Sequence, residues 1–354
     1  MAFYKTAKKL YNIRMLVSDY NYNLPDENIA KHPPKIRGTT RLLVLDKNTG
    51  DITDSHYADL ADFLEPGDLV ILNDTRVMRA RLFAELPGGY KRELIVLEKH
   101  KADLNSVMYH GKLRAGDVLT IKTERDGELT NDTVTISEIL GNGTATVSSS
   151  RPLAEIVEAH GSVPLPPYLH RDASPEDVKR YQTVWAKKLG SAAAPTASLN
   201  MTEDLLAKLK DKGIDIHYLT LHVGLGTFLP IRSDKVEEHH MHSEWFHIPE
   251  NTIEAIKKTK ASGHKVVAVG TTVTRTLEYY AKTGKTEGED DIFIYPGFQF
   301  QIVDALLTNF HAPKSTVLML ASAFAKWENL KPAYEHAIKS GYQLLSYGDS
   351  MLIK

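Results

Sequence analysis

The hydrophobic positions between residues 68 and 150 form short runs interrupted by turn residues. Apolar runs occupy residues 69–72, 94–97 and 118–121, and glycine turns such as Gly88-Gly89 and Gly141-Asn142-Gly143 break the pattern. Runs of this length bounded by turn signals are typical of β-strands. Because the strands are short and closely spaced, this part of the chain is predicted to form a small antiparallel barrel.

From about residue 163 the pattern changes, since strand-like runs alternate with helical ones. Strands are expected at residues 214–223, 265–269, 291–295 and 342–346, and helices at residues 252–261, 274–282, 314–325 and 331–339. A strand at 41–46 and a helix-like segment at 57–64 fit the same layering. This alternation predicts α/β layers with crossover connections.

Together the two patterns predict a mixed α/β fold with an inserted antiparallel β-barrel. We expect a discontinuous α/β catalytic domain at residues 1–67 and 156–354, and a barrel domain at residues 68–155. The length of 354 residues agrees with two domains.

The composition excludes several classes of protein. The chain has no cysteine, which excludes disulfides, thiolate nucleophiles and cysteine-based metal sites. No stretch approaches the roughly 20 apolar residues of a membrane helix, and the basic residues 1–14 lack the apolar run of a secretory signal. We therefore expect a cytoplasmic protein that does not enter a membrane. Since the net charge is −2, binding to RNA would require basic residues gathered on one face.

Polar residues follow two of the predicted strands. Asn73-Asp74-Thr75-Arg76 comes directly after the run 69–72, and Thr220-Leu221-His222-Val223-Gly224 leads into the glycine pair Gly224 and Gly226. Carboxyl ends of strands are where α/β sheets bind ligands. The alternatives are an aspartate-led turn with a surface arginine for the first motif and a tight turn for the second.

Residues 237–244 concentrate histidines and carboxylates, which are also metal ligands. Their spacing matches no standard zinc motif, so no metal is expected here. We favour general acid/base chemistry or ligand binding at His242 and Glu244, with Glu237 and Glu238 on a solvated face.

Three further segments place polar groups after strands. Gly270-Thr271-Thr272-Val273-Thr274-Arg275 opens a helix, where free amides favour a carboxylate or phosphate, although a threonine N-cap is an equal alternative. Thr308-Asn309-Phe310-His311 precedes the helix near residue 314, and Ser346-Tyr347-Gly348-Asp349 ends the last predicted strand. Their common position favours one shared cleft.

The same segments resemble the S-adenosylmethionine:tRNA ribosyltransferase-isomerase family of queuosine biosynthesis. Further motifs that carry the resemblance are Leu165-Pro166-Pro167-Tyr168, Tyr181-Gln182-Thr183-Val184, Ala193-Ala194-Pro195-Thr196-Ala197, Ile292-Phe293-Ile294-Tyr295-Pro296-Gly297 and Arg41-Leu42-Leu43-Val44-Leu45-Asp46. The resemblance spans about residues 19–352 and implies an α/β domain with an inserted barrel.

The resemblance also implies a reaction. S-adenosylmethionine would act as a co-substrate that donates its ribosyl part, and no further cofactor would be needed. The acceptor would be 7-aminomethyl-7-deazaguanine at the wobble position of tRNA, giving epoxyqueuosine-tRNA, adenine and methionine. The partners expected are therefore S-adenosylmethionine and tRNA carrying the queuosine precursor. For contact with tRNA phosphates, Arg79 and Arg81 are favoured over Arg76.

The candidate residues fall into two groups. Catalytic roles are expected for Asp74, His222, His242, Glu244 and His311. Substrate or S-adenosylmethionine binding is expected for Arg76, Thr196, Asn200, Gly224, Thr271, Thr272, Arg275, Asn309, Tyr347 and Asp349.

One segment departs from the family pattern. Where the family usually continues Pro-Thr-Ala with Gly-Leu-His-Phe-Thr, this chain has Ser198-Leu199-Asn200-Met201-Thr202. If the lost histidine is a base or acid, the chain is a catalytically impaired tRNA-binding paralogue, and Asn200→His should raise turnover. If the histidine only orients substrate, Asn200 suffices. Asn200 with Glu203 also fits a helix cap, and action on a different nucleoside is a further alternative.

Overall fold

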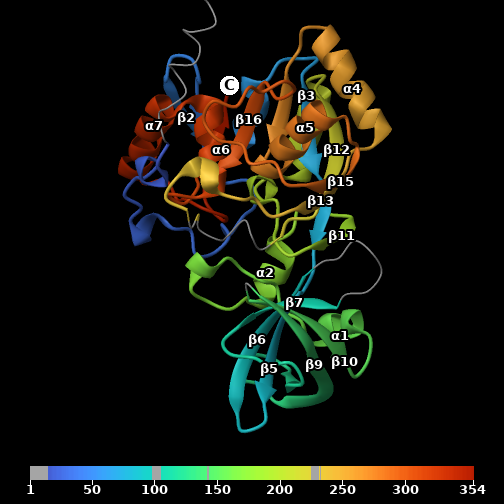
Figure 1. Cartoon of the computed structure of the whole chain (residues 1–354). Helices are drawn as coiled ribbons and strands as arrows, with labels where there is room; N and C mark the ends of the chain where they lie inside the picture. The colour runs from blue at the N-terminus through green and yellow to red at the C-terminus, as the bar shows by residue number, and fades with distance from the viewer. Residues whose placement is uncertain (1–14, 98–104, 142, 225–230, 232) are drawn as a thin grey trace, which may run out of the picture.

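The chain forms an α/β body with a β-barrel below it (Figure 1). The computed structural model describes residues 15–97, 105–141, 143–224, 231 and 233–354. The body is built on a nine-stranded mixed sheet with the order β15-β13-β12-β3-β14-β16-β17-β1-β2. Strands β12, β3, β14 and β16 run parallel. The predicted mixed α/β fold with an antiparallel barrel is confirmed.

The sheet strands are β1 (Arg41–Leu45), β2 (Ile52–His56), β3 (Leu69–Asn73), β12 (Asp215–Leu221), β13 (Glu244–His247), β14 (Val266–Val269), β15 (Glu287–Asp290), β16 (Ala305–Asn309) and β17 (Ser350–Ile353). The helices are α1 (Leu153–His160), α2 (Pro175–Arg180), α3 (Glu203–Asp211), α4 (Glu250–Ala261), α5 (Thr271–Thr283), α6 (Thr316–Ala325) and α7 (Trp327–Lys339), with a 3₁₀ helix η4 (Tyr57–Phe63).

The two faces of the sheet are buried against different helices. Alternate residues of β3 show this division, since Leu69 and Ile71 pack with α4, α5, α6 and α7 while Val70 and Leu72 pack with η4 and α3. All five residues of β3 are buried. A strand covered on both faces reads as a continuous apolar run, which is the pattern found at residues 69–72.

The barrel begins later in the chain than the sequence pattern suggested. Its strands, in the closed order β10-β7-β6-β5-β8-β9, are β5 (Arg81–Leu86), β6 (Tyr90–Leu97), β7 (Ser106–His110), β8 (Val118–Lys122), β9 (Leu129–Gly141) and β10 (Thr144–Ser149). The run 69–72, which we grouped with the barrel strands, is β3 of the central sheet. The division into two folding domains stays a prediction.

Two predicted strands are absent from the described fold. Residues 291–295 follow β15 without pairing, and residues 342–346 form a loop before β17. In that loop Asp349 accepts hydrogen bonds from the amides of Arg41 and Gln343, both at 2.7 Å, and Leu345 has a φ of 71°. The amides of Leu344 and Leu345 donate to the carbonyls of Asn28 and Phe310, so the segment is bound by scattered contacts and not by a strand ladder.

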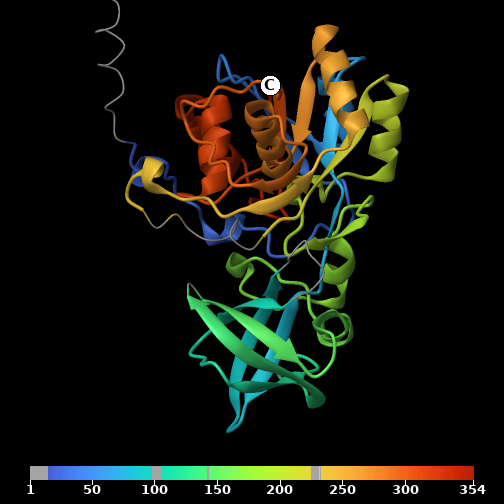
Figure 2. The same cartoon turned by 45° about the vertical axis from the view of Figure 1, so that its right-hand side comes forward.

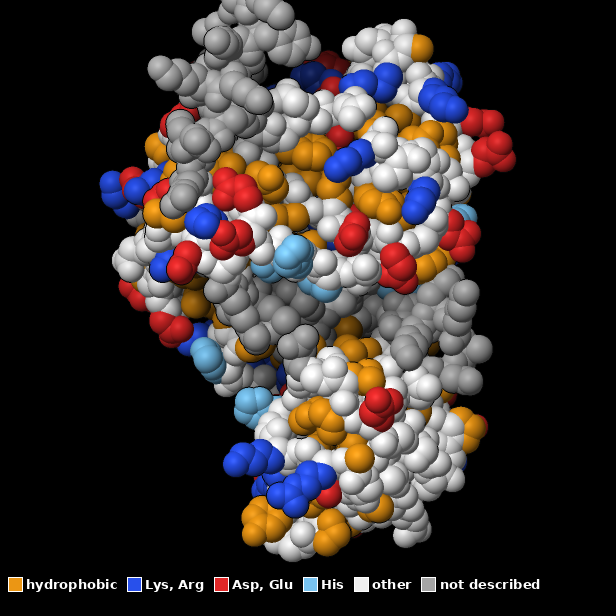
Figure 3. Space-filling view, viewed as in Figure 1, with side chains coloured by type: hydrophobic (Ala, Val, Ile, Leu, Met, Phe, Trp, Pro, Cys, Tyr) orange, Lys and Arg blue, Asp and Glu red, His pale blue; other side chains and the backbone are white. Residues whose placement is uncertain are grey.

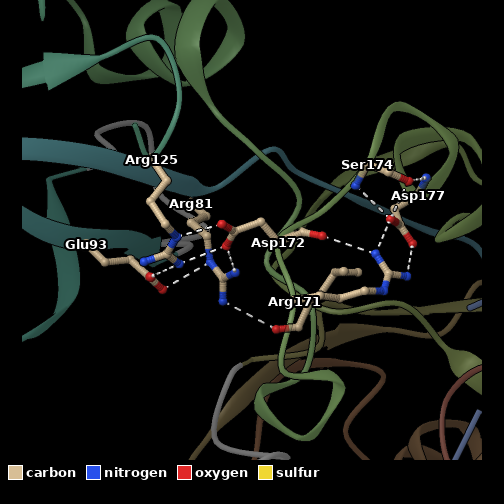
Figure 4. A network of polar contacts seen from close by, with 8 residues as sticks. Arg81, Glu93, Arg125, Arg171, Asp172, Ser174 and Asp177 are labelled. Atoms are coloured by element: carbon tan, nitrogen blue, oxygen red, sulfur yellow. Dashed lines mark hydrogen bonds and ion pairs between the residues drawn. The ribbon is translucent and has the colours of Figure 1, made fainter. Parts of the chain in front are cut away.

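Charged side chains join the barrel to the body (Figure 4). Arg81 of β5 lies 3.0 Å from Glu93, and Arg125 contacts Asp172 at 2.6 Å. Beside them, Arg171 contacts Asp177, which also accepts from Tyr347 at 2.6 Å. Figure 2 shows the barrel below the body, with connecting segments between the two. No helix among the described residues is long and apolar enough to span a bilayer.

Candidate active site

A cavity lies at the carboxyl ends of the parallel strands. Its wall includes Val223 after β12, Gly270 after β14 and Asn309 at the end of β16. Residues 193–197, which precede α3, and the segment 310–315 before α6 complete much of the lining. Parallel strands leave their carboxyl ends at one edge of a sheet, which is where α/β folds bind ligands.

The cavity collects five of the expected site residues. They are Thr196, Thr271, Thr272, Asn309 and His311. Thr272 Oγ1 and Asn309 Oδ1 are buried and have no hydrogen-bond partner in the described structure. Since buried polar atoms are nearly always paired, these two atoms mark positions where a ligand is expected to bind.

The first turn of α5 faces the cavity without a side-chain cap. Gly270 is the N-cap, with a φ of 97°, and none of the following threonines caps the helix. The alternative that a threonine serves as N-cap is therefore wrong. The unpaired amides of this turn give the cavity wall a partial positive charge, which suits an anionic or electron-rich ligand group.

His311 is held neutral by its surroundings. Its Nε2 lies 2.8 Å from Thr308 Oγ1, and its amide donates to the Tyr334 hydroxyl at 2.9 Å. Burial lowers the pKa of His311 to about 3. At neutral pH the ring can therefore exchange hydrogen bonds with a ligand but does not carry a positive charge.

The neutral, half-buried His311 should make folding sensitive to acid. Because its pKa is about 3 in the folded chain against 6.5 in its ordinary state, the unfolded chain binds the proton first as the pH falls below 6.5. The contribution of His311 to the free energy of unfolding is therefore complete above pH 6.5 and is lost as the pH falls below it. The loss is about 2 kcal/mol at about pH 5. Urea unfolding at pH 7 and pH 5 should show a smaller acid loss for His311→Gln than for the exposed control His240→Gln. Equal losses would contradict this assignment.

Two cavity residues with functional chemistry were not among the site residues predicted from the sequence. The hydroxyl of Tyr168 forms a short hydrogen bond with Ser346, and burial raises the pKa of Tyr168 to about 12. Lys314 is exposed at the cavity wall in a left-handed conformation with φ 58°. Tyr168 could have been identified as a site residue, because it lies in a motif that carries the family resemblance. No sequence feature identified Lys314, because a lysine before a helix is common.

A buried ion-pair cluster lies behind the first turn of α5. Arg275 contacts Glu244 at 2.7 Å and the backbone carbonyl of Asp290 at 3.2 Å. Glu244 also accepts from the Gly224 amide at 2.7 Å and lies 3.4 Å from His242 Nε2. Although burial opposes it, the Arg275 and His242 side chains hold the pKa of Glu244 below its usual value. The cluster thus ties α5 to the exit of β12, next to Val223 of the cavity.

Three other expected residues lie away from the cavity lining, and two of them have structural partners. Asp74 accepts from Thr220 at 2.6 Å, and His222 Nδ1 lies 2.8 Å from Thr75 Oγ1 with its ring stacked on Trp245. Arg76 is exposed on β4 (Thr75–Val77). The second glycine of the motif, Gly226, lies outside the described residues.

Tyr347 and Asp349 also serve the fold rather than the cavity wall. Tyr347 donates to Asp177, and Asp349 accepts from the backbone amides of Gln343 and of Arg41 at the start of β1. Burial raises the pKa of Asp349. The described residues contain no group of three or more histidine, aspartate or glutamate side chains placed to hold a metal ion.

A family model described as "Queuosine biosynthesis protein" matches residues 17–353. The chain belongs to this family. Relatives named "S-adenosylmethionine:tRNA ribosyltransferase-isomerase" include those of Chlorobaculum parvum, 53% identical, and Pelodictyon phaeoclathratiforme, 52% identical; each match covers 96% of this chain and all of the relative. The relative from Francisella philomiragia, with the same name, is 44% identical over the same share.

A solved structure agrees with the family. The "S-adenosylmethionine tRNA ribosyltransferase" of Thermotoga maritima is 30% identical and matches 95% of this chain and all of its own, with a TM-score of 0.54. The queuosine family therefore accounts for both the body and the barrel of this chain.

Asn200, the departure from the family pattern, is a buried structural residue in this fold. Its Nδ2 donates to the Gly348 carbonyl at 3.0 Å, and it does not line the cavity. The predicted cap at Asn200 is wrong, because Thr202 caps α3 by accepting from the Leu205 amide. Asn200 therefore fixes the position of the Gly348 backbone, and this contact requires only an N–H donor.

Asn200→His is expected to change turnover by less than about threefold, because an imidazole N–H can replace the donor to Gly348. Steady-state turnover, with the melting temperature as a check on packing, measures this. A rise of about tenfold, equal to about 1.4 kcal/mol in the barrier, would show instead that the chain lacks a catalytic imidazole.

Proposed function

We propose that the chain is an S-adenosylmethionine:tRNA ribosyltransferase-isomerase. The observation that supports this most strongly is the cavity at the carboxyl edge of the sheet, with Thr272 Oγ1 and Asn309 Oδ1 buried and unpaired among the described residues. Relatives that carry this name match the chain along nearly its whole length. A tRNA substrate also implies action in the cytoplasm.

The cavity wall suits the parts of S-adenosylmethionine. Small apolar side chains at 193, 194 and 197, together with Val223, offer a surface for the adenosyl group. Asn309 Oδ1 would accept a hydrogen bond from an amino group or hydroxyl of that group. Lys314 and the first turn of α5 would attract the methionine carboxylate.

The first chemical step would remove a proton from the ribose carbon attached to sulfur, which the sulfonium charge acidifies. We assign the acceptor role to His242, oriented by Glu244. The Glu244 carboxylate, 3.4 Å from Nε2, would favour the tautomer with the proton on Nε2, so that Nδ1 keeps its lone pair for the substrate proton. A Cβ built on Gly224 would lie 3.8 Å from His242 Cδ2, which places this ring beside the cavity wall at Val223.

The later steps need side chains that form hydrogen bonds with the reacting groups without changing their own charge. Adenine leaves first, and neutral His311 would assist it through a ring nitrogen. The aminomethyl nitrogen of the 7-deazaguanine then bonds to the carbon that adenine left, the ring oxygen is released from that carbon, and the deprotonated carbon bonds to it instead. The released oxygen displaces methionine, which departs with the electron pair of the C–S bond, and this closes the epoxide. Holding the reacting groups in a dry cleft is the main contribution expected from the protein.

The test is incubation with S-adenosylmethionine and tRNA carrying the deazaguanine precursor. We expect adenine and methionine to appear in equal amounts, and only when this tRNA is present. Release of S-adenosylhomocysteine would show methyl transfer and contradict the proposal. Binding of the tRNA without adenine release would support the alternative of an impaired paralogue, which the Ser198 and Asn200 changes suggest.

Asn309→Ala should weaken S-adenosylmethionine binding about 5- to 150-fold, which corresponds to about 1–3 kcal/mol for a ligand donor left without its acceptor. The matched control is Asn28→Ala, since Asn28 is also buried and donates to a backbone carbonyl, at 2.9 Å, away from the cavity. Isothermal titration with S-adenosylmethionine measures both. Equal affinity of the two variants would reject a ligand contact at Asn309.

A further inference from the structure

A small ribbon at the junction of barrel and body carries exposed cations. It pairs β4 with the parallel strand β11 (Lys188–Ser191), and β11 lies between the two parts of the molecule (Figure 1). Arg76, Lys187 and Lys188 are all exposed, and Leu189, the partner of Arg76 in the register, is 63% exposed. We call these four residues the junction ribbon.

The cations of the junction ribbon are free, unlike other arginines of the junction. Arg81, Arg125 and Arg171 are each paired with a carboxylate. Over the described part of the chain, the side chains of Arg76, Lys187 and Lys188 make no hydrogen bond or ion pair. The expectation that Arg81 contacts phosphate is therefore wrong, because Arg81 is buried against Glu93.

The chain runs directly from the junction ribbon into the cavity wall. Ala193, the first cavity residue of that segment, follows Leu189 by four positions, and four extended residues span at most about 14 Å. On the face shown in Figure 3, basic and acidic side chains are interspersed. The distribution of charge on this face therefore does not identify an RNA-binding surface by itself. An RNA strand held on the ribbon would be within a few nucleotides of the cavity.

We propose that the junction ribbon binds the sugar-phosphate backbone of the tRNA loop whose modified nucleotide enters the cavity. This rests on the proposed function and adds the surface that presents the acceptor. Arg76, Lys187 and Lys188 neutralise phosphates, and Leu189 packs against an unstacked base or its sugar. Phosphate contacts of this kind fix the register of the strand without reading its sequence.

The test compares the variant R76Q/K187Q/K188Q with the matched control K257Q/K258Q/K285Q. The control also removes three exposed cations without ion pairs in the described chain, on α4 and after α5, away from the ribbon. Affinity for the precursor tRNA is measured between about 50 and 300 mM salt. Each lost contact to a single strand should reduce the slope of log affinity against log salt by about 0.7, so three reduce it by about 2.

The ribbon variant should lose tRNA affinity at least about tenfold near physiological salt, while S-adenosylmethionine affinity and melting temperature stay unchanged. The control should bind tRNA like the unsubstituted chain. Equal affinity and slope for both variants, with the unsubstituted chain binding tRNA, would overturn the ribbon alone. If the unsubstituted chain bound S-adenosylmethionine but no tRNA, the proposed function would fall, and the ribbon with it.

Discussion

Replacing His242 by glutamine is expected to lower the turnover rate by about 10²- to 10⁴-fold, the range that a positioned general base contributes. Glutamine keeps a hydrogen-bond donor toward Glu244 but cannot take a proton at neutral pH. S-adenosylmethionine should still bind with nearly unchanged affinity, because the base acts on a proton that leaves only during the reaction. Single-turnover measurement of adenine release separates this step from binding.

The matched control is His240→Gln, two residues away. His240 is exposed and has no carboxylate partner in the described chain, so its replacement should leave turnover unchanged. A His242→Gln variant that kept a third or more of the turnover would remove His242 from the base role and leave Glu244 as a purely structural residue.

Arg275→Met should destabilise the folded chain by about 3–5 kcal/mol, the usual effect of leaving a buried charge without its partner. Arg275, Glu244 and Asp290 are all buried, and one guanidinium serves both carboxylates. Burial already raises the pKa of Asp290 to about 6 despite Arg275. Urea unfolding measures the loss, with the exposed Lys282→Met on the same helix as control, expected within about 0.5 kcal/mol.

The loss caused by Arg275→Met should become smaller in acid. Without the guanidinium the pKa values of both carboxyls rise in the folded chain, so the folded state binds protons that the unfolded state does not. The penalty therefore grows as the pH rises above the unfolded pKa and shrinks as the pH falls from 7 to 5. A loss that is equal at both pH values would mean that solvent reaches the cluster.

The sequence predicted the elements of the body better than their pairing. Helices α4, α5, α6 and α7 were expected near their observed positions, because their apolar residues recur at helical spacing. The run 69–72 was placed in the barrel by its neighbours in sequence, whereas its continuous apolar character is typical of a central parallel strand. The loop at 342–346 depends on Asp349 contacting Arg41 across the chain, which no local pattern reveals.

The sequence predicted those site residues that come together because parallel strands end at the same edge of the sheet. Thr271 and Asn309 meet because β14 and β16 are parallel neighbours that end at the same edge. Asp74 and Tyr347 also follow apolar runs, yet their partners are Thr220 and Asp177, far away in sequence. Local chemistry does not distinguish a strand-exit carboxylate that binds a ligand from one that fixes the fold.

The most direct measurement follows two labels of S-adenosylmethionine, one in the ribose and one in the methyl group, during reaction with the precursor tRNA. We expect the ribose label to become bound to the tRNA while the methyl label leaves in free methionine. Asn309→Ala should slow this transfer at limiting S-adenosylmethionine, and Asn28→Ala should not. Methyl label on the tRNA, with the ribose label remaining in a free nucleoside, would refute ribosyl transfer.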